Sequence, residues 1–472
     1  MNRKLLCSAL TCSAVLLSAC GGGGGIVHPE SDTKKNVLFF LGDGMGITTL
    51  TAARIYSVGE DGELTMDKLP ETAFVHTYSN DAQVTDSAPS MAAYMTGVKM
   101  NNEVISMTAD TKATDASGKP YHTNFDSTCP TTNGKAVPTL LEQMKAAGYG
   151  TGVVSTTRIT HATPAATYSH VCHRDAENTI AAALVPAGKG YNAALGDGVD
   201  VIFGGGSSYF TPKADGGKRN DARNLMTELK AQKYSVAASK ADFDKLPVDG
   251  SKVVGLFTKD HMAYDLDRDA SKEPSLAEMT GKAIDVLAAK KKNFFLMVEG
   301  GRIDHALHAT NARRALQDTV AFDDAIKAAL AKMEKLDPGL KNTLVVVTAD
   351  HDHTMHLNGY AQRTGKTEAG KPGILGLVKN YVDGKASTDV GGNPYTILGF
   401  GNGPNRPAAR AAINEASLES RDYLQEAVVP LATETHGGAD VFLGAQGAGA
   451  DSFSGVIENT DVFKLIKKSI NL

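Results

Sequence analysis

Carboxylates and histidines gather directly after apolar runs of this 472-residue chain. They follow residues 36–41, 294–298 and 343–347, and the groups are Asp43, then Glu299, Asp304 and His308, then Asp350, His351 and His353. Asp304 and His308 are four residues apart, so they share one face if that segment is helical. Imidazole and carboxylate groups at such spacing hold divalent metal ions. The pattern predicts a metal centre, although Asp43 alone could cap a helix and a single His could lie on a helix surface.

Two weaker signals lie elsewhere in the chain. His436 stands beside Gly437 and Gly438, as a ligand on a tight turn would. Ser87, in Thr85-Asp86-Ser87-Ala88, precedes a predicted helix at 91–95, and free N–H groups at a helix start favour an incoming anion. By itself Ser87 could be a simple helix cap. Because no GxSxG elbow surrounds it, a nucleophilic Ser87 would need another activator, of which metal coordination is the obvious one.

The elements that must position these groups alternate between strand and helix. Short β-rich runs without polar alternation recur at 36–41, 72–78, 152–155, 201–203, 294–298 and 343–347. Helical spacing occurs at 136–147, 275–290 and 311–335. This alternation predicts an α/β fold with a large, mainly parallel central sheet and helices on both faces. Ligand sites in such sheets lie at the carboxyl ends of strands, where the groups occur.

Two parts of the chain depart from this alternation. Residues from about 359 to 432 are rich in Gly and Pro and weakly periodic, which predicts an inserted, crown-like subdomain. Residues 1–19 have the basic start and short apolar stretch of an export signal. Leu17-Ser18-Ala19-Cys20, followed by five glycines, resembles a bacterial lipoprotein signal and predicts a lipid on Cys20, with 20–35 as a linker. The alternative is a plain secretory signal cleaved near Ala19.

Either signal predicts export, to the periplasm or cell envelope, with the lipid as a membrane anchor. Cys7 and Cys12 leave with the signal, so Cys129 and Cys172 remain as an even pair in an oxidising compartment. We expect a disulfide between them, and two free buried thiols are the alternative. The formal net charge of -5 gives no indication of a nucleic-acid partner.

Six ordered motifs resemble those of the alkaline phosphatase family. They are Asp43-Gly44-Met45-Gly46, Thr85-Asp86-Ser87-Ala88, His161-Ala162-Thr163-Pro164-Ala165, Val298-Glu299-Gly300-Gly301-Arg302-Ile303-Asp304-His305, Thr348-Ala349-Asp350-His351-Asp352-His353 and Glu434-Thr435-His436-Gly437-Gly438. They span nearly the whole chain from about residue 36. The resemblance implies hydrolysis of a broad range of small phosphate monoesters through a phosphoserine, with an alkaline pH optimum. It also implies a homodimer, although this chain could be monomeric.

The resemblance further implies two zinc ions and one magnesium ion. One zinc would be held by Asp304, His308 and His436, and the other by Asp43, Asp350 and His351, with Ser87 as a fourth ligand. Magnesium would be held by Asp43, Thr163 and Glu299 with waters. This division matches the preference of zinc for imidazole and of magnesium for oxygen.

The remaining site residues also come from the resemblance. Arg174 matches the phosphate-binding arginine, whose guanidinium fork suits two phosphoryl oxygens; a surface salt bridge is the alternative. Catalysis is assigned to Ser87 and Arg174, and substrate binding to these two and Asp86. His161 and His305 would lie near the magnesium waters and His353 near the second zinc. Thr258 stands where a calcium site of animal members needs a carboxylate, so no calcium is predicted.

Two other readings of the same residues remain. A phosphodiesterase or sulfatase would share the fold, but Thr163, Arg174 and Glu299 together favour a monoesterase. A surface protein that stores zinc or captures phosphate belongs to a different class, and the intact nucleophile and arginine argue against it.

Overall fold

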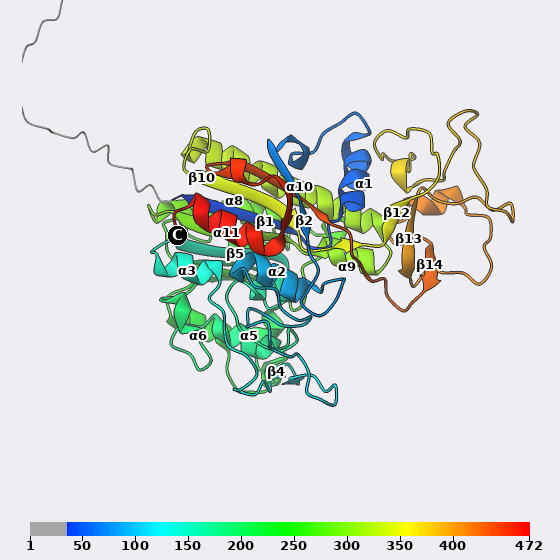
Figure 1. Cartoon of the computed structure of the whole chain (residues 1–472). Helices are drawn as coiled ribbons and strands as arrows, with labels where there is room; N and C mark the ends of the chain where they lie inside the picture. The colour runs from blue at the N-terminus through cyan, green and yellow to red at the C-terminus, as the bar shows by residue number, and fades with distance from the viewer. Residues whose placement is uncertain (1–34) are drawn as a thin grey trace, which may run out of the picture. The chain divides into compact units, whose positions relative to one another are not determined.

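A ten-stranded sheet runs through residues 35–472, the part of the chain that the computed structural model describes (Figure 1). The predicted signal and Cys20 lie outside the described residues. In spatial order the strands are β17 (Gly455–Glu458), β2 (Glu71–His76), β16 (Val441–Gly447), β10 (Thr343–Ala349), β1 (Asn36–Gly42), β9 (Phe294–Gly300), β5 (Gly150–Arg158), β6 (Val201–Gly205), β8 (Val253–Leu256) and β7 (Ser235–Ala237).

The strands run parallel except for β16, which is antiparallel to both of its neighbours. At the centre, Leu38 of β1 pairs with Val345 of β10 and Leu296 of β9. These three strands are buried along their length apart from Asn36, because helices cover both faces. The predicted mainly parallel sheet is therefore confirmed. The six predicted runs correspond to β1, β2, β5, β6, β9 and β10, and a strand-like stretch at 440–443 lies at the start of β16. The sequence pattern misses β7, β8 and β17, which have only three or four residues.

Two groups of helices cover the sheet (Figure 1). On one face, α8 (Leu276–Ala289), α10 (Ala312–Leu336) and α1 (Ile47–Val58) pack together, and on the other α2 (Ser87–Thr96), α3 (Leu140–Ala146) and α11 (Asn459–Ser469) do so. The predicted helices 275–290 and 311–335 correspond to α8 and α10. Their first turns are capped by Ser275, which accepts a hydrogen bond from the Glu278 amide, and by Asn311, which accepts one from the Arg314 amide.

The predicted helix at 136–147 is wrong at its start, since α3 begins at Leu140. Thr139 is its N-cap: the Thr139 Oγ1 accepts from the Glu142 amide at 3.2 Å, and Glu142 Oε2 accepts from the Thr139 amide at 2.7 Å. Thr139 therefore has extended backbone. Pro138 also disfavours helical conformation at Val137. The apolar spacing extends N-terminally beyond Leu140 to residue 136, but the helical backbone does not.

A separate three-stranded sheet lies beside the ten-stranded one (Figure 1). It contains β12 (Met355–Leu357), β13 (Leu398–Gly403) and β14 (Ala427–Pro430). Much of the remaining chain between β12 and β14 has irregular structure, as the abundance of Gly and Pro there favours. The predicted insertion at 359–432 thus contains β13 and β14, and β12 precedes it.

The structure joins Cys129 and Cys172 by a disulfide, as predicted. The bond ties the loop after β4 (Asp126–Ser127) to the segment that carries Arg174. Among the helices of residues 35–472, none combines the length and apolar character needed to cross a bilayer.

Removing the charge of Glu142 should have a pH-dependent effect on stability. The Glu142 Oε1 lies 2.7 Å from His170 Nε2, and although burial lowers the pKa of His170, the Glu142 carboxylate more than offsets this and the pKa is raised. Protonated His170 stabilises the folded protein fully at pH values below its unfolded-state pKa of about 6.5. This stabilisation is lost as the pH rises through the higher pKa of the folded state. Glu142→Gln should therefore cost about 2 kcal/mol near pH 6 and less near pH 9.

Thermal unfolding of the wild-type protein and of Glu142→Gln at pH values near 6 and 9 measures the effect. Glu278→Gln is the matched control, because Glu278 occupies the same capping position of α8 without a histidine partner. An equal loss of stability for Glu142→Gln at both pH values would contradict the assigned coupling.

Candidate functional site

The carboxyl ends of β1, β9 and β10 lie side by side in the sheet. The register places Gly42 opposite both Gly300 and Ala349. Asp43 and Asp350 follow directly, and Glu299 is the penultimate residue of β9, so three fully buried carboxylates converge. Residues more than 300 positions apart in sequence are thus brought together by parallel pairing alone.

The first group of polar side chains surrounds Asp304. Helix α9 (Arg302–His308) places Asp304 and His308 on one face, as their spacing predicts. The Asp304 Oδ1 lies 3.2 Å from His308 Nε2, 3.5 Å from His436 Nε2 and 2.9 Å from His353 Nε2. The structure corrects the predicted place of His353, which belongs to this group and not to that of Asp350, because its ring lies between Asp304 and Glu434.

The second group contains Asp43, Asp350 and His351. The His351 Nε2 lies 3.4 Å from Asp43 Oδ1 and 3.4 Å from Asp350 Oδ2. The Asp350 Oδ1 accepts hydrogen bonds from the Gly44 and His351 amides, whereas Oδ2 is buried without a hydrogen-bond partner among the described residues. Ser87 Oγ lies 3.1 Å from His351 Nε2 and 3.4 Å from Asp43 Oδ1. The serine therefore faces the same point in space as the three ligand candidates.

The third group contains oxygen atoms that find no partner within the described chain. They are Asp43 Oδ2, Thr163 Oγ1 and Glu299 Oε1, all buried. Each such atom costs about 1–3 kcal/mol if nothing binds to it. Burial raises the pKa of Glu299 to about 7 and, together with the Asp350 carboxylate, raises the pKa of Asp43 well above its usual value. Two carboxylate oxygens and one hydroxyl oxygen without partners fit a bound cation that prefers oxygen ligands.

Ser87 is the first residue of helix α2, which begins four residues earlier than predicted. Asp86 is the N-cap, and its Oδ1 accepts from the Ala88 amide at 3.3 Å. The interpretation of Ser87 as a helix cap is therefore wrong, and its hydroxyl is free to face the second group. The N–H groups of the first turn of α2 also favour an anion at this point.

Arg174 reaches the site from the segment after the disulfide. Its Nη1 donates to the Asp86 carboxylate and its Nη2 donates to His161 Nε2 at 2.9 Å. Burial alone would lower the pKa of Arg174, but the Asp86 and Glu103 carboxylates more than offset this and raise it, so the guanidinium stays charged. Asp86 thus caps the helix of Ser87 and aims Arg174 with the same carboxylate.

The contact with Arg174 also determines where the ring proton of His161 lies. Because a guanidinium can only donate, His161 Nε2 must accept, and the proton is on Nδ1. That Nδ1 is buried without a partner among residues 35–472, and His161 lies close to Asp43 and Glu299. It is therefore placed to donate to a water in the third group. His305 lies beside it, with ring centroids 5.3 Å apart.

Sequence reasoning did not assign several residues that support these groups. Glu434 is fully buried, and its Oε2 lies 2.5 Å from His353 Nδ1 while Oε1 accepts from the Thr354 amide. Its position two residues before the predicted ligand His436 was the one feature of the sequence that could have indicated it. Ser155 holds the Glu299 carboxylate, and the His261 ring lies 4.2 Å from that of His305. No local pattern marks Ser155 or His261.

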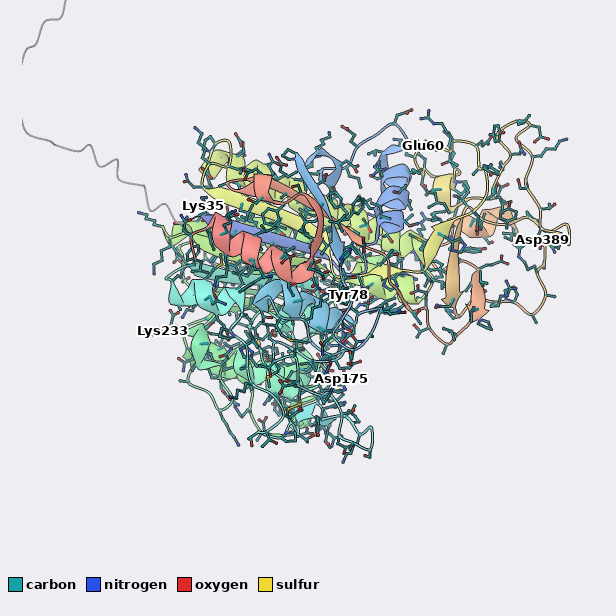
Figure 2. The ribbon with its side chains drawn as sticks, in the orientation of Figure 1. Lys35, Glu60, Tyr78, Asp175, Lys233 and Asp389 are labelled. Carbon is teal, nitrogen blue, oxygen red and sulfur yellow. A yellow bond between two sulfur atoms is a disulfide. The ribbon has the colours of Figure 1, made fainter. Side chains whose placement is uncertain are left out.

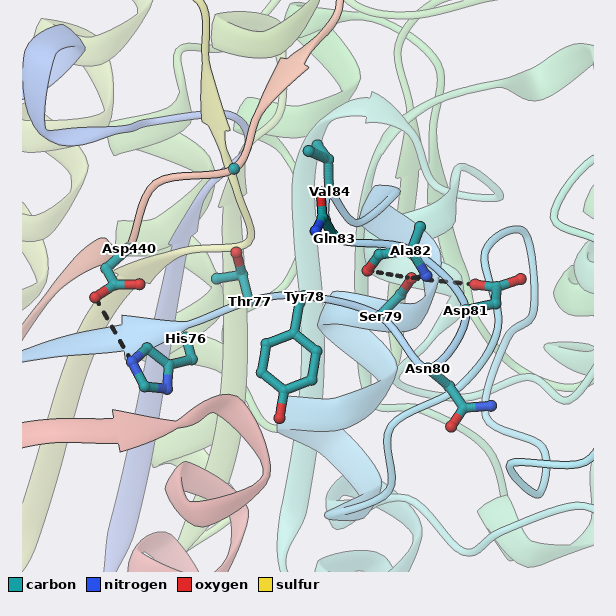
Figure 3. A pocket seen from close by; sticks show the side chains of 11 residues that line it. His76, Thr77, Tyr78, Ser79, Asn80, Asp81, Ala82, Gln83, Val84 and Asp440 are labelled. Atoms are coloured by element: carbon teal, nitrogen blue, oxygen red, sulfur yellow. Dashed lines mark hydrogen bonds and ion pairs between the residues drawn. The ribbon is translucent and has the colours of Figure 1, made fainter.

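Solvent reaches the site through a depression of about 420 Å³. Its lining includes Asp86, His308 and His436. A larger open groove of about 820 Å³ shares Val84 with it but contains no member of the three groups. Figure 3 shows this groove, with His76 facing Asp440 at one side. The chemistry therefore belongs to the smaller depression.

Known proteins resemble the chain along nearly its whole length. The family model described as alkaline phosphatase matches residues 34–472. The alkaline phosphatase of Gadus morhua is 36% identical over 455 residues, which are 90% of this chain and 89% of that protein. The tissue-nonspecific isozyme of Mus musculus is 36% identical over 461 residues, 91% of this chain and 82% of that protein.

Solved structures share the fold. The alkaline phosphatase of Thermus thermophilus has a TM-score of 0.66 at 23% identity, covering 93% of this chain and 92% of that one. The alkaline phosphatase of the Antarctic bacterium TAB5 has a TM-score of 0.60 at 23% identity, covering 93% and 98%.

Glu434→Gln should weaken metal retention by the Asp304 group. The carboxylate that orients His353 would become an amide, and loss of such outer contacts costs roughly 10–100-fold in metal affinity. Loading each protein with zinc as the probe ion and following its transfer to a chelating dye measures this. Glu142→Gln is the matched control, since Glu142 is another buried carboxylate paired with a histidine but lies outside the three groups. Equal zinc retention by both variants would contradict the role of Glu434.

Proposed function

Because the chain belongs to the alkaline phosphatase family, it is a phosphatase, and we propose that it hydrolyses phosphate monoesters through a phosphoserine on Ser87. The observation that carries this proposal is the position of Ser87. Its Oγ lies within 3.4 Å of two members of the second group, while Asp86, next in the chain, aims Arg174 at the same point. A nucleophile, a cationic fork and metal-ligand candidates thus share one small volume.

The proposal includes two zinc ions and one magnesium ion. Each of the groups Asp304, His308 and His436 and Asp43, Asp350 and His351 includes imidazole and suits zinc, whereas Asp43, Thr163 and Glu299 offer only oxygens and suit magnesium. When bound, zinc would supply the positive charge that lowers the pKa of a nucleophile and stabilises a leaving oxygen. Because protonated ligands must lose their protons to bind metal, activity should rise into the alkaline range.

The side chains of the site perform the steps that surround this chemistry. Arg174 would hold two phosphoryl oxygens of the monoester with its guanidinium fork. Ser87 Oγ passes its proton to water and attacks phosphorus, so that a phosphoserine forms. The bond from phosphorus to the ester oxygen breaks, and this oxygen takes up a proton from water and leaves as the alcohol. Water then attacks the phosphorus, which releases inorganic phosphate and restores Ser87. Among the described residues, the side chains that contact Ser87 Oγ are Asp43 and His351, both proposed metal ligands, so neither serves as a free base.

Ser87→Ala should lower phosphate release from p-nitrophenyl phosphate by at least about a thousandfold, the scale found when a covalent nucleophile is removed. Metal content should not change, since the eight other proposed ligands remain. The wild-type protein should cleave the monoester faster than the bis-p-nitrophenyl ester. Retained activity in Ser87→Ala would remove Ser87 as the nucleophile, and faster diester cleavage would replace the monoesterase proposal by a phosphodiesterase.

We also propose that the protein is exported and anchored by a lipid on Cys20. The support is the Leu17-Ser18-Ala19-Cys20 sequence and the glycines after it. Cys20→Ala should move the protein from the membrane fraction to the soluble exported fraction. Cys12→Ala is the control, because Cys12 lies within the same signal. Membrane retention of Cys20→Ala would contradict the anchor. Homodimerisation stays a prediction that light scattering of the purified protein tests.

A further inference from the structure

A fourth group of metal-ligand side chains lies outside the three groups at the strand ends. It contains His122 of strand β3 (His122–Thr123) and His173 and Asp175, which flank Arg174 in sequence. One nitrogen or oxygen atom of each lies within 4.8 Å of those of the other two. Asp175 is labelled in Figure 2. Neither the motifs of the chain nor the proposed reaction uses His122, His173 or Asp175.

Several polar atoms of this group make no hydrogen bond within the described chain. The His122 Nδ1 is buried without a hydrogen-bond partner among the described residues. The His122 Nε2 lies 3.6 Å from the Asp175 carboxylate, too far for a hydrogen bond. The rings of His122 and His173 face each other with centroids 4.4 Å apart. The His173 Nδ1 accepts from the Asp175 amide at 3.2 Å, which leaves Nε2 as its second nitrogen. The group therefore offers ring nitrogens and a carboxylate that are available to a bound cation.

The covalent structure holds the three side chains in place before any metal arrives. The Cys129–Cys172 disulfide joins the residue before His173 to the loop that follows β4, and β4 pairs with β3. The Ser127 amide also donates to Thr179 Oγ1 at 2.9 Å. These contacts hold the segment of His122 close to that of His173. Such preorganisation lowers the entropy cost of binding.

The surrounding charges favour a cation. The Asp175 carboxylate belongs to the group, and the Asp86 and Glu103 carboxylates act electrostatically on His173 and Asp175. Arg174 is a nearby cation, but its guanidinium is paired with Asp86. Two imidazoles and one carboxylate are ligands for zinc and similar divalent ions, and the half-exposed Asp175 leaves coordination positions for water.

We propose that His122, His173 and Asp175 bind one additional zinc ion, and that this ion inhibits the enzyme by shifting Arg174. Ligation through His173 Nε2 places the ring proton on Nδ1, where it faces the amide N–H of Asp175. Two donors then oppose each other, so the turn across residues 173–175 must change. Arg174 is the central residue of this turn. The inhibition rests on the proposed role of Arg174 in holding phosphate, whereas the zinc site does not.

Calorimetric titration of the zinc- and magnesium-loaded protein with additional zinc tests the site. Wild type should bind one equivalent more than His122→Ala and more than Asp175→Asn. His76→Ala is the matched control, because His76 faces the carboxylates of Asp440 and Glu458 but has no second histidine, and it should bind as wild type does. Equal binding by wild type and both site variants would overturn the proposal. Using two variants guards against one that does not fold.

The monoester assay with added zinc tests the inhibition separately. The kcat/KM of wild type should fall by roughly 10–100-fold, as expected when a substrate-positioning group is slightly misplaced. His122→Ala should keep its activity without added zinc and should resist this loss. Zinc binding without inhibition of wild type would overturn the link to Arg174. Equal inhibition of wild type and His122→Ala would overturn it too, because the inhibition would then arise at another site. Absence of monoesterase activity before zinc is added would contradict the proposed function and not this site.

Discussion

The site depends on one constraint, which is the burial of four carboxylates at the carboxyl ends of the central strands. Asp43, Glu299, Asp304 and Asp350 are each at most 4% exposed, and their charges repel one another. Backbone amides satisfy one oxygen of Asp350, but oxygens of Asp43, Asp350 and Glu299 have no partner in the described chain. Burying such groups is unfavourable by several kcal/mol unless positive charge accompanies them. The fold is therefore built to enclose cations, and the chemistry follows from this requirement.

The parallel sheet makes this arrangement possible. Strands β1, β9 and β10 end at the same level, so Asp43 and Asp350, directly after β1 and β10, meet Glu299 near the end of β9. The strands themselves are apolar and fully covered by helices, which keeps the carboxyl groups in a fixed geometry. A rigid scaffold of this kind positions ligand atoms better than loops alone would.

A few side chains outside the ligand groups connect this scaffold to the reacting residues. Asp86 caps the helix of Ser87 and holds Arg174, so the proposed nucleophile and the proposed phosphate-binding guanidinium have a common support. Glu434 does the equivalent for His353 and hence for Asp304. The segment of Arg174 is tied in turn by the Cys129–Cys172 disulfide. Arg174 also lies between His173 and Asp175 in sequence, so a change at these two residues and His122 would act on it directly.

The sequence by itself determined the class of fold, the places of the central strands to within a few residues and most members of the ligand groups. Apolar runs identify buried strands because both faces must be covered, and the four-residue spacing of Asp304 and His308 is a property of one helix. These signals are local, so they can be read without knowing the fold. The resemblance of the ordered motifs supplied the roles of Ser87 and Arg174, which their local sequence did not.

Only the tertiary structure decided which side chains meet. Glu434 and His353 are 81 residues apart, and Ser155 and Glu299 are 144 apart, so no local pattern connects them. The same holds for the placement of His353 beside Asp304 and for the meeting of His122 with His173. Even local boundaries depended on it: the Thr139–Glu142 cap sets where α3 begins, and Asp86, not Ser87, caps α2. Contacts between distant segments are fixed by packing and strand register, which apolar periodicity constrains only in part.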